Sequence, residues 1–315
     1  MMTDMKEFID KLRSSPFIHE KRFGDISSFN FTRKAFYQSH WDELTTKARG
    51  LFINTRTEEI VARGYDKFFN VDENPQTTMD AIRERAAYPI EVYKKENGYL
   101  GLISWDHTKG DFLFATKSML ENSYVEDLKQ IFFHSGIHVD KIADFLCKAE
   151  CFGASVTMIV EVIDPILDPH IIEYQNAHLV LLDIVSNTLE SHYTIYPLLS
   201  VKAFEFGMEV KKHERTIMDW HEVEDIKWCC EHPRYFDRNG KPFEGYVFRD
   251  ARGYMFKMKT AYYLQWKHYR RCADLILQGL PYKDAPDPFL TWVEENKDGL
   301  ERKSIIEMRN MYENH

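Results

Sequence analysis

The sequence lacks any long apolar segment and any excess of positive charge. No stretch reaches the roughly 18 apolar residues that a membrane-spanning helix requires, and the first residues show no basic segment followed by an apolar run. Lys and Arg number 41 against 50 Asp and Glu, which gives a net charge of −9. No global positive field therefore draws the chain to nucleic acid or to an acidic membrane. We expect a soluble cytoplasmic protein with no membrane partner, which holds any polyanion at a local patch.

Cysteine is scarce and is not arranged for zinc or for a disulfide framework. The five cysteines are Cys147, Cys151, Cys229, Cys230 and Cys272. None of them forms a CxxC pair, and adjacent cysteines rarely bind one tetrahedral ion together. Internal repeats and low-complexity tracts are also missing. We therefore expect reduced, structural thiols in a chain whose 315 residues fold into one large domain or two smaller ones.

Segments rich in β-branched and aromatic residues predict strands through much of the chain. With 44% hydrophobic and 14% aromatic residues, the composition supplies a packed core and excludes a disordered chain. The predicted strands are 50–54, 59–64, 90–94, 99–104, 112–116, 156–163, 178–185, 245–249 and 254–259. Few of them alternate strictly with helices, so we expect mainly antiparallel sheets and the α+β fold class.

Helical spacing marks both ends of the chain and a segment in the middle. A short amphipathic helix is predicted near residues 5–12, and two more around 125–132 and 139–146. After residue 260 the pattern is purely helical. We therefore predict a main domain over residues 1–260 and a small α-helical C-terminal domain over residues 261–315.

One strand runs directly into a lysine and a turn signal. Residues 90–94 are followed by Lys95, and Asn97-Gly98 then marks a tight turn before the next strand. A lysine amine is a nucleophile only when it is deprotonated, so a reactive Lys95 needs burial or neighbouring cations that lower its pKa. The alternative is a structural lysine before an ordinary hairpin turn.

Two further lysines and two glutamates sit in later strands. Alternation along a strand sends Lys257 and Lys259 to one face, where they form either a solvated surface or a pair of cations that grips a triphosphate. Glu161 lies inside an apolar strand, and Glu244 precedes the strand that contains Arg249. A carboxylate in such a strand is costly unless it is paired or bound to a metal.

A local basic patch follows these strands. Residues 252–271 contain six Lys or Arg, no Asp or Glu, and many aromatic residues. Lys267, Arg270 and Arg271 are our candidates for contacts with an RNA backbone, with aromatic rings to stack on bases. The alternative is a helix whose aromatic rings pack on the core while these three cations are solvated.

The order of these motifs resembles the covalent nucleotidyltransferase superfamily of RNA ligases, DNA ligases and capping enzymes. The segments Ala48-Arg49-Gly50 and 67–70 (KFFN) narrow the resemblance to the phage RNA ligase 1 family and the related ligase domain of fungal tRNA ligases. It covers roughly residues 49–259. It departs from many superfamily members at Asn97, where they have Asp, and in its short helical tail.

The resemblance implies a ligase adenylation fold, unrelated to ATP-grasp enzymes, and a role for each matching residue. Lys95 would be the adenylated nucleophile, acting with Glu244, Lys257 and Lys259. The nucleotide would be held by Arg49, Lys67, Lys117, Glu161, Lys257 and Lys259. Glu161 and Glu244 would be the metal ligands. The implied cofactors are ATP and Mg²⁺ or Mn²⁺.

The activity implied by the resemblance is ATP-dependent RNA ligation. RNA ends with a 5′-phosphate and a 3′-hydroxyl would be joined through a lysyl-AMP and an RNA-adenylate, in RNA repair that includes tRNA repair. No obligate protein partner is inferred. Two alternatives stay open: another covalent nucleotidyltransferase, either a DNA ligase or an mRNA capping guanylyltransferase, and an inactive RNA-binding module on the same fold.

Overall fold

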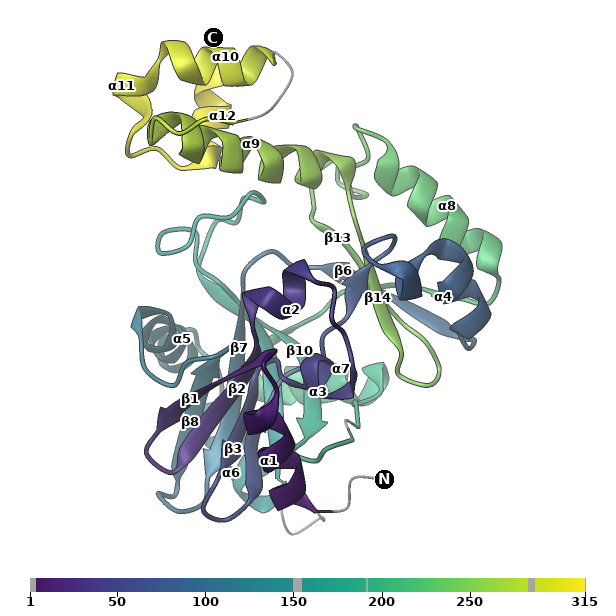
Figure 1. Cartoon of the computed structure of the whole chain (residues 1–315), viewed down its shortest axis with the longest axis vertical. Helices are drawn as coiled ribbons and strands as arrows, with labels where there is room; N and C mark the ends of the chain where they lie inside the picture. Colours follow the sequence, from purple (N-terminus) through teal and green to yellow (C-terminus); the bar gives the residue numbers. More distant parts are fainter. Residues whose placement is uncertain (1–3, 150–154, 191, 283–286, 315) are drawn as a thin grey trace.

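The computed structural model describes residues 4–149, 155–190, 192–282 and 287–314, which form three sheets with helices packed on their outer faces (Figure 1). The first sheet contains four antiparallel strands, in the order β1 (Ile18–Phe23), β2 (Ile26–Phe31), β3 (Leu51–Asn54) and β4 (Glu59–Arg63). Helix α1 (Met5–Ser14) buries Phe8, Ile9 and Leu12 against this sheet. The short helices α2 (Arg33–Tyr37) and α3 (Glu43–Lys47) connect β2 to β3.

The second sheet forms the centre of the fold. Its strand order is β11 (Glu209–Val210), β10 (His178–Ser186), β9 (Val156–Ile163), β7 (Tyr99–Asp106) and β8 (Asp111–Thr116). One face is covered by α5 (Ser123–His134), α6 (Val139–Lys148) and α7 (Tyr196–Phe206). The other face packs on the first sheet, where Phe52 and Ala62 meet Leu102 and Ala115. Burial on both faces explains why these strands are almost continuously apolar.

The third sheet carries the chemistry-bearing lysines. Its strand order is β12 (His213–Ile217), β6 (Ile90–Lys95), β13 (Gly245–Arg249), β14 (Met255–Lys259) and β5 (Phe69–Asn70). Helices α4 (Met79–Arg85) and α8 (Trp220–Glu231) cover its outer face, where Phe248 stacks on Phe256 at 4.5 Å between ring centroids. The 3₁₀ turn Pro75–Thr77 leads into α4. The opposite face is left for polar residues.

The C-terminal helices form a core of their own. They are α9 (Ala261–Leu277), α10 (Pro288–Glu295), α11 (Lys297–Leu300) and α12 (Ile305–Glu313). This core also buries Ile171 and Ile172, which follow β9, so the helices are attached to the main body by more than the chain connection. The start of α9 coincides with the expected boundary at residue 260, and a division into two domains stays a prediction. Among the described helices, none is long and apolar enough to cross a membrane.

The predicted α+β class and antiparallel pairing are confirmed. All nine predicted strands are present with ends within two residues, and the parallel pairs in the described part of the chain are β10 with β11 and β14 with β5. The first two strands were not predicted, because β1 is half-exposed and β2 buries Ser27 and Ser28 instead of an apolar series. The four described cysteines form no disulfide, and Cys151 lies outside the described residues.

The alternative interpretation, an ordinary hairpin turn at Asn97-Gly98, is wrong. Strand β6 belongs to the third sheet and β7 to the second, so these two residues cross from one sheet to the other. Only glycine fits at position 98 because the backbone of Val162 lies so close: a Cβ on Gly98 would be 2.1 Å from the carbonyl oxygen of Val162. The crossing therefore needs a residue without a side chain. In the sequence, a glycine required for this reason looks the same as a glycine required by a turn.

This contact predicts a large effect of Gly98→Ala on stability. We expect the free energy of unfolding to fall by at least about 2 kcal/mol, because the new methyl group displaces backbone in a packed region. Chemical denaturation followed by circular dichroism measures it. Gly299→Ala is the matched control, since a Cβ at Gly299 meets nothing within 4 Å. Equal stability of the two variants would contradict the close approach.

Candidate active site

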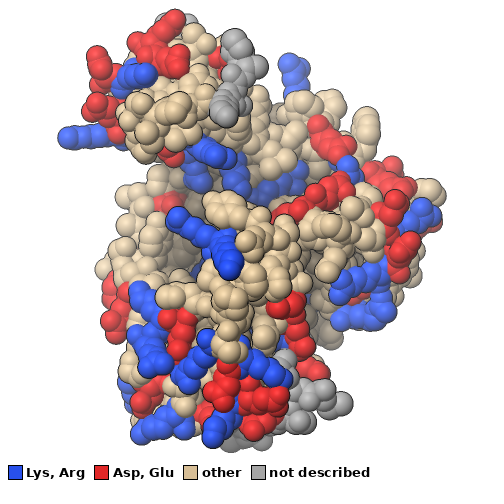
Figure 2. Space-filling model, viewed as in Figure 1, with Lys and Arg blue, Asp and Glu red and all other residues tan. Residues whose placement is uncertain are grey.

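A polar cavity of about 340 Å³ lies between the second and third sheets. Nine of its lining residues are Lys or Arg and three are Glu, so it favours an anion. Its lining includes every residue that the sequence assigns to catalysis or to nucleotide binding: Arg49, Lys67, Lys95, Lys117, Glu161, Glu244, Lys257 and Lys259. Figure 2 shows Lys and Arg side chains gathered in the hollow below the C-terminal helices.

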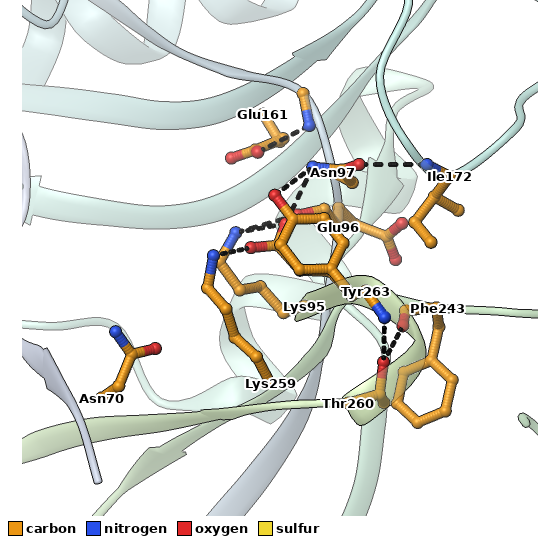
Figure 3. A network of polar contacts seen from close by, with 12 residues as sticks. Asn70, Lys95, Glu96, Asn97, Glu161, Ile172, Phe243, Lys259, Thr260 and Tyr263 are labelled. Carbon is orange, nitrogen blue, oxygen red and sulfur yellow. Dashed lines mark hydrogen bonds and ion pairs between the residues drawn. The ribbon is translucent and has the colours of Figure 1, made fainter. Parts of the chain in front are cut away.

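Strand register places the two lysines on either side of one carboxylate. Gly245 of β13 is paired with Lys95 of β6 on one side and with Lys259 of β14 on the other. The backbones of these two lysines are two strand spacings apart, which is about 10 Å. Glu244, which precedes Gly245, bridges them: Lys95 Nζ donates to its Oε2 at 2.9 Å, and Lys259 Nζ lies 2.8 Å from its Oε1 (Figure 3).

The carboxylates decide the protonation of Lys95. Burial lowers its pKa, but Glu244 and Glu161 more than offset this, so the pKa is raised above the ordinary value of lysine. The expectation that neighbouring cations lower the pKa of Lys95 is therefore wrong for the protein without nucleotide. Lys95 is held as a charged ammonium, and it must lose a proton before it can act as a nucleophile.

Asn97 locks the end of β6 in place and is almost fully buried. Its Nδ2 donates to Glu244 Oε2 at 2.9 Å, and its Oδ1 accepts a hydrogen bond from Ile172 N at 3.2 Å (Figure 3). Tyr174 accepts from its backbone N–H. An aspartate has no N–H to donate and would repel Glu244. Asn97 is thus a positioning residue, and its amide suits this arrangement.

A second group of cations faces the cavity around Lys257. Burial, with smaller contributions from Lys67 and Lys95, holds the pKa of Lys257 well below its ordinary value. Burial lowers the pKa of Lys67 to about 8, despite its partner Glu73. Arg49 Nη1 is buried and has no hydrogen-bond partner among the described residues. Desolvated cations of this kind are stabilised by an incoming anion.

Glu161 projects into the cavity from β9, between Val160 and Val162, which face the core behind it. Its Oε1 accepts a hydrogen bond from Gly98 N at 2.9 Å, and burial raises its pKa. The described residues contain no group of three His, Cys, Asp or Glu that holds a metal without help. Because both oxygens of Glu244 are paired with lysines, Glu161 is the carboxylate that would hold a hard cation such as Mg²⁺.

The deep wall of the cavity holds a buried ion network that was not predicted. Asp183 of β10 is fully buried, and its Oδ2 lies 2.9 Å from Arg249 Nη1 and 3.3 Å from Lys211 Nζ. Tyr65 donates its hydroxyl to the same oxygen at 3.1 Å. The available signal was an aspartate inside an apolar strand, which is the same signal that drew attention to Glu161.

The three cations of the basic helix lie outside the cavity. Lys267, Arg270 and Arg271 are on α9, whose Tyr263 and Trp266 are buried in the C-terminal core. The aromatic rings therefore pack as the alternative interpretation expected, and these cations are at least partly exposed. Lys267 is near enough to contribute to the lowered pKa of Lys259, which is due mainly to burial. Contact with RNA stays a prediction.

Comparisons with known proteins point to one family. The family model described as RNA ligase, of the T4 RNA ligase 1 type, matches residues 47–263. The tRNA ligase 1 of Schizosaccharomyces pombe is 36% identical over 110 residues, which cover 30% of this chain and 14% of that protein. The tRNA ligase of Candida albicans is 25% identical over 283 residues, which cover 76% of this chain and 32% of that protein. The chain thus spans a third or less of the length of these relatives.

A solved structure shares the fold. A protein of Aquifex aeolicus described as an ATP-dependent DNA ligase superposes with a TM-score of 0.56 and 14% identity, over 98% of this chain and 75% of that one. Identity this low shows the ligase nucleotidyltransferase fold alone. The family model is more specific, because it covers more than half of the chain and contains every residue that lines the polar cavity except Phe31. The chain belongs to the phage-type RNA ligase family.

Proposed function

We propose that the chain is an ATP-dependent RNA ligase that works through a lysyl-AMP on Lys95. The observation that carries the proposal is the cavity itself, which brings seven predicted residues from distant parts of the sequence around Lys95. Its excess of cations matches a triphosphate. The volume of about 340 Å³ lies within the range of small-molecule sites.

The proposed reaction consists of three in-line displacements at phosphorus. Lys95 Nζ attacks the α-phosphate of ATP, a P–N bond forms, and pyrophosphate leaves. The AMP then passes to an RNA 5′-phosphate, and an RNA 3′-hydroxyl displaces AMP as the phosphodiester forms. In each step negative charge develops on phosphate oxygens, which Arg49, Lys257 and Lys259 are placed to stabilise.

We assign the metal site to Glu161, together with the phosphates of the bound nucleotide. A divalent cation at this position would offset charge on the phosphate oxygens. Glu244 has a different role in the ligand-free protein, since it holds Lys95 and Lys259 in register. Whether Mg²⁺ or Mn²⁺ is preferred is decided by comparing the two ions in the adenylation assay below.

RNA is the proposed substrate because of the family and the fungal tRNA ligases among the relatives. The likeness to a DNA ligase concerns the fold. After the last lysine motif the chain continues as helices α9 to α12, with no β-barrel among the described residues. RNA ends with a 5′-phosphate and a 3′-hydroxyl are therefore the proposed partners, and broken tRNA is the substrate to test first.

The first prediction is a covalent AMP on Lys95. Incubation with ATP and Mg²⁺ is expected to add the mass of one AMP to the intact protein, and peptide mapping should place it on Lys95. Lys95→Ala should abolish the adduct. Lys129→Ala is the control, because Lys129 is paired with Glu126 at 2.7 Å on α5, outside the cavity, and it should leave adenylation intact.

The adduct assay and a separate sealing assay together distinguish the alternatives. An adduct formed with GTP in preference to ATP would indicate capping chemistry. Sealing of nicked duplex DNA but not of single-stranded RNA would indicate a DNA ligase. Absence of any adduct with either nucleotide would contradict the proposed function and favour an RNA-binding module.

The second prediction concerns pH. Because Glu244 and Glu161 raise the pKa of Lys95, the neutral amine is a small fraction at pH 7, and its reactivity should rise about tenfold per pH unit. In Glu244→Gln the raising charge is lost, so the reactivity curve of Lys95 should shift to lower pH. Acylation of the ATP-free protein, followed by mass spectrometry of the Lys95 peptide, measures it. An unchanged curve beside the exposed control Glu301→Gln would contradict the assignment.

The third prediction tests the basic helix. If Lys267, Arg270 and Arg271 contact RNA phosphates, then neutralising all three should raise the KM for RNA and flatten its dependence on salt, because fewer counterions are released on binding. Adenylation of Lys95 should be spared, since the three side chains lie outside the cavity. Sealing that matches the parent at every salt concentration would show that these cations are only solvated.

A further inference from the structure

Two aromatic side chains are exposed on the short helix α2, which directly follows the strand at the cavity entrance. Phe36 is 50% exposed and Tyr37 is 79% exposed. Phe31, the last residue of β2, lines the cavity itself. Exposing two neighbouring large rings has no benefit for folding, because each ring removed from water would contribute to stability.

These rings belong to a continuous aromatic path that ends in the cavity. Tyr37 contacts Phe36 at 5.8 Å between ring centroids, and Phe36 contacts Trp41 at 6.4 Å. Trp41 in turn contacts Phe31 at 5.1 Å and Phe69 at 4.9 Å. The path therefore joins the exposed face of α2 to the lining of the cavity.

Cations accompany the path along its length. Lys117 Nζ lies 4.8 Å from the ring of Phe31, and Lys67 Nζ lies 5.3 Å from the ring of Trp41. Arg33 and Lys34 are exposed on α2. Of the two nearby acidic residues, Asp42 caps α3 and pairs with His40, and Glu43 is exposed. Figure 2 shows Lys and Arg side chains in the region where Figure 1 draws α2.

We propose that Phe36, Tyr37 and Trp41 form a stacking surface for the unpaired bases next to the RNA end that reacts in the cavity. The inference rests on the proposed function and adds the means by which the RNA strand is held. Aromatic rings interleaved with cations are the arrangement that binds single-stranded nucleic acid with little sequence preference, since every base has a π-face and every nucleotide a phosphate.

Another exposed apolar surface of the chain lacks these features and provides a contrast. Helix α7 exposes Leu198 at 50%, Val201 at 61% and Phe204 at 87%. None of these three residues lines the polar cavity. Phe204 is therefore a control ring of similar exposure that should not contact the RNA.

The experiment measures RNA binding apart from adenylation. Phe36→Ala/Tyr37→Ala is compared with Phe204→Ala in the 315-residue chain, using a single-stranded RNA that carries a 5′-phosphate and a 3′-hydroxyl. We expect the double variant to raise the KM for RNA by about tenfold or more, because base stacking is lost. Adenylation with ATP should stay at the parent level in both variants. The aromatic variant Phe36→Tyr/Tyr37→Phe should restore the KM.

A fluorescent base reports the stacking directly. RNA with 2-aminopurine beside the 5′ end, or beside the 3′ end, should be quenched on binding to the parent protein from at least one end, and not on binding to Phe36→Ala/Tyr37→Ala. The quenched end identifies the strand that the surface holds. Quenching that persists in the double variant, or an unchanged KM, would overturn the proposal while normal adenylation leaves the ligase assignment standing. If the parent protein itself forms no adenylate, the proposed function is refuted instead.

Discussion

The buried carboxylate of Glu244 is the interaction on which the site depends. It accepts from Lys95, Asn97 and Lys259, which come from two strands and a crossing segment. With 3% of its side chain exposed, the carboxylate would be costly to bury without these partners. Removing it would leave two lysine ammonium groups facing each other in a desolvated pocket. The ion group therefore keeps the cations in place before any nucleotide arrives, and it also keeps Lys95 protonated until the site is occupied.

The crossing at Asn97 and Gly98 connects the two sheets that enclose the cavity. Because β6 and β7 belong to different sheets, the chain brings Lys95 of the third sheet next to Glu161 of the second. Gly98 permits the contact with Val162, and Asn97 connects the crossing to Ile172 in the segment that enters the C-terminal core. The helices are thereby coupled to the nucleophile, since Tyr263 of α9 lies within 3.5 Å of Asn97 Nδ2.

Burial and mutual repulsion disfavour the charged forms of the cations around Lys257. Burial is the main cause of the lowered pKa values of Lys257 and Lys67, and repulsion by neighbouring cations lowers them further. A bound triphosphate would relieve both the desolvation and the repulsion. The buried cations thus lower the folding stability and raise the affinity for an anion. In the network of Asp183, Arg249 and Lys211, both cations are paired with a fully buried carboxylate, and burial still lowers the pKa of Lys211 to about 8.

The sequence alone determined nine of the strands, the helical tail and the identity of the chemical groups. Alternation in β14 was enough to place Lys257 and Lys259 on one face, and a charge inside an apolar strand was enough to single out Glu161. Tertiary structure decided the rest. Local patterns do not show that β6 and β7 separate into two sheets or that Asp183 meets Arg249 across 66 residues. Nor do they show that Glu244 and Glu161 outweigh burial in setting the pKa of Lys95. Each of these depends on distances between groups far apart in the chain, and electrostatic energies change steeply with such distances and with burial.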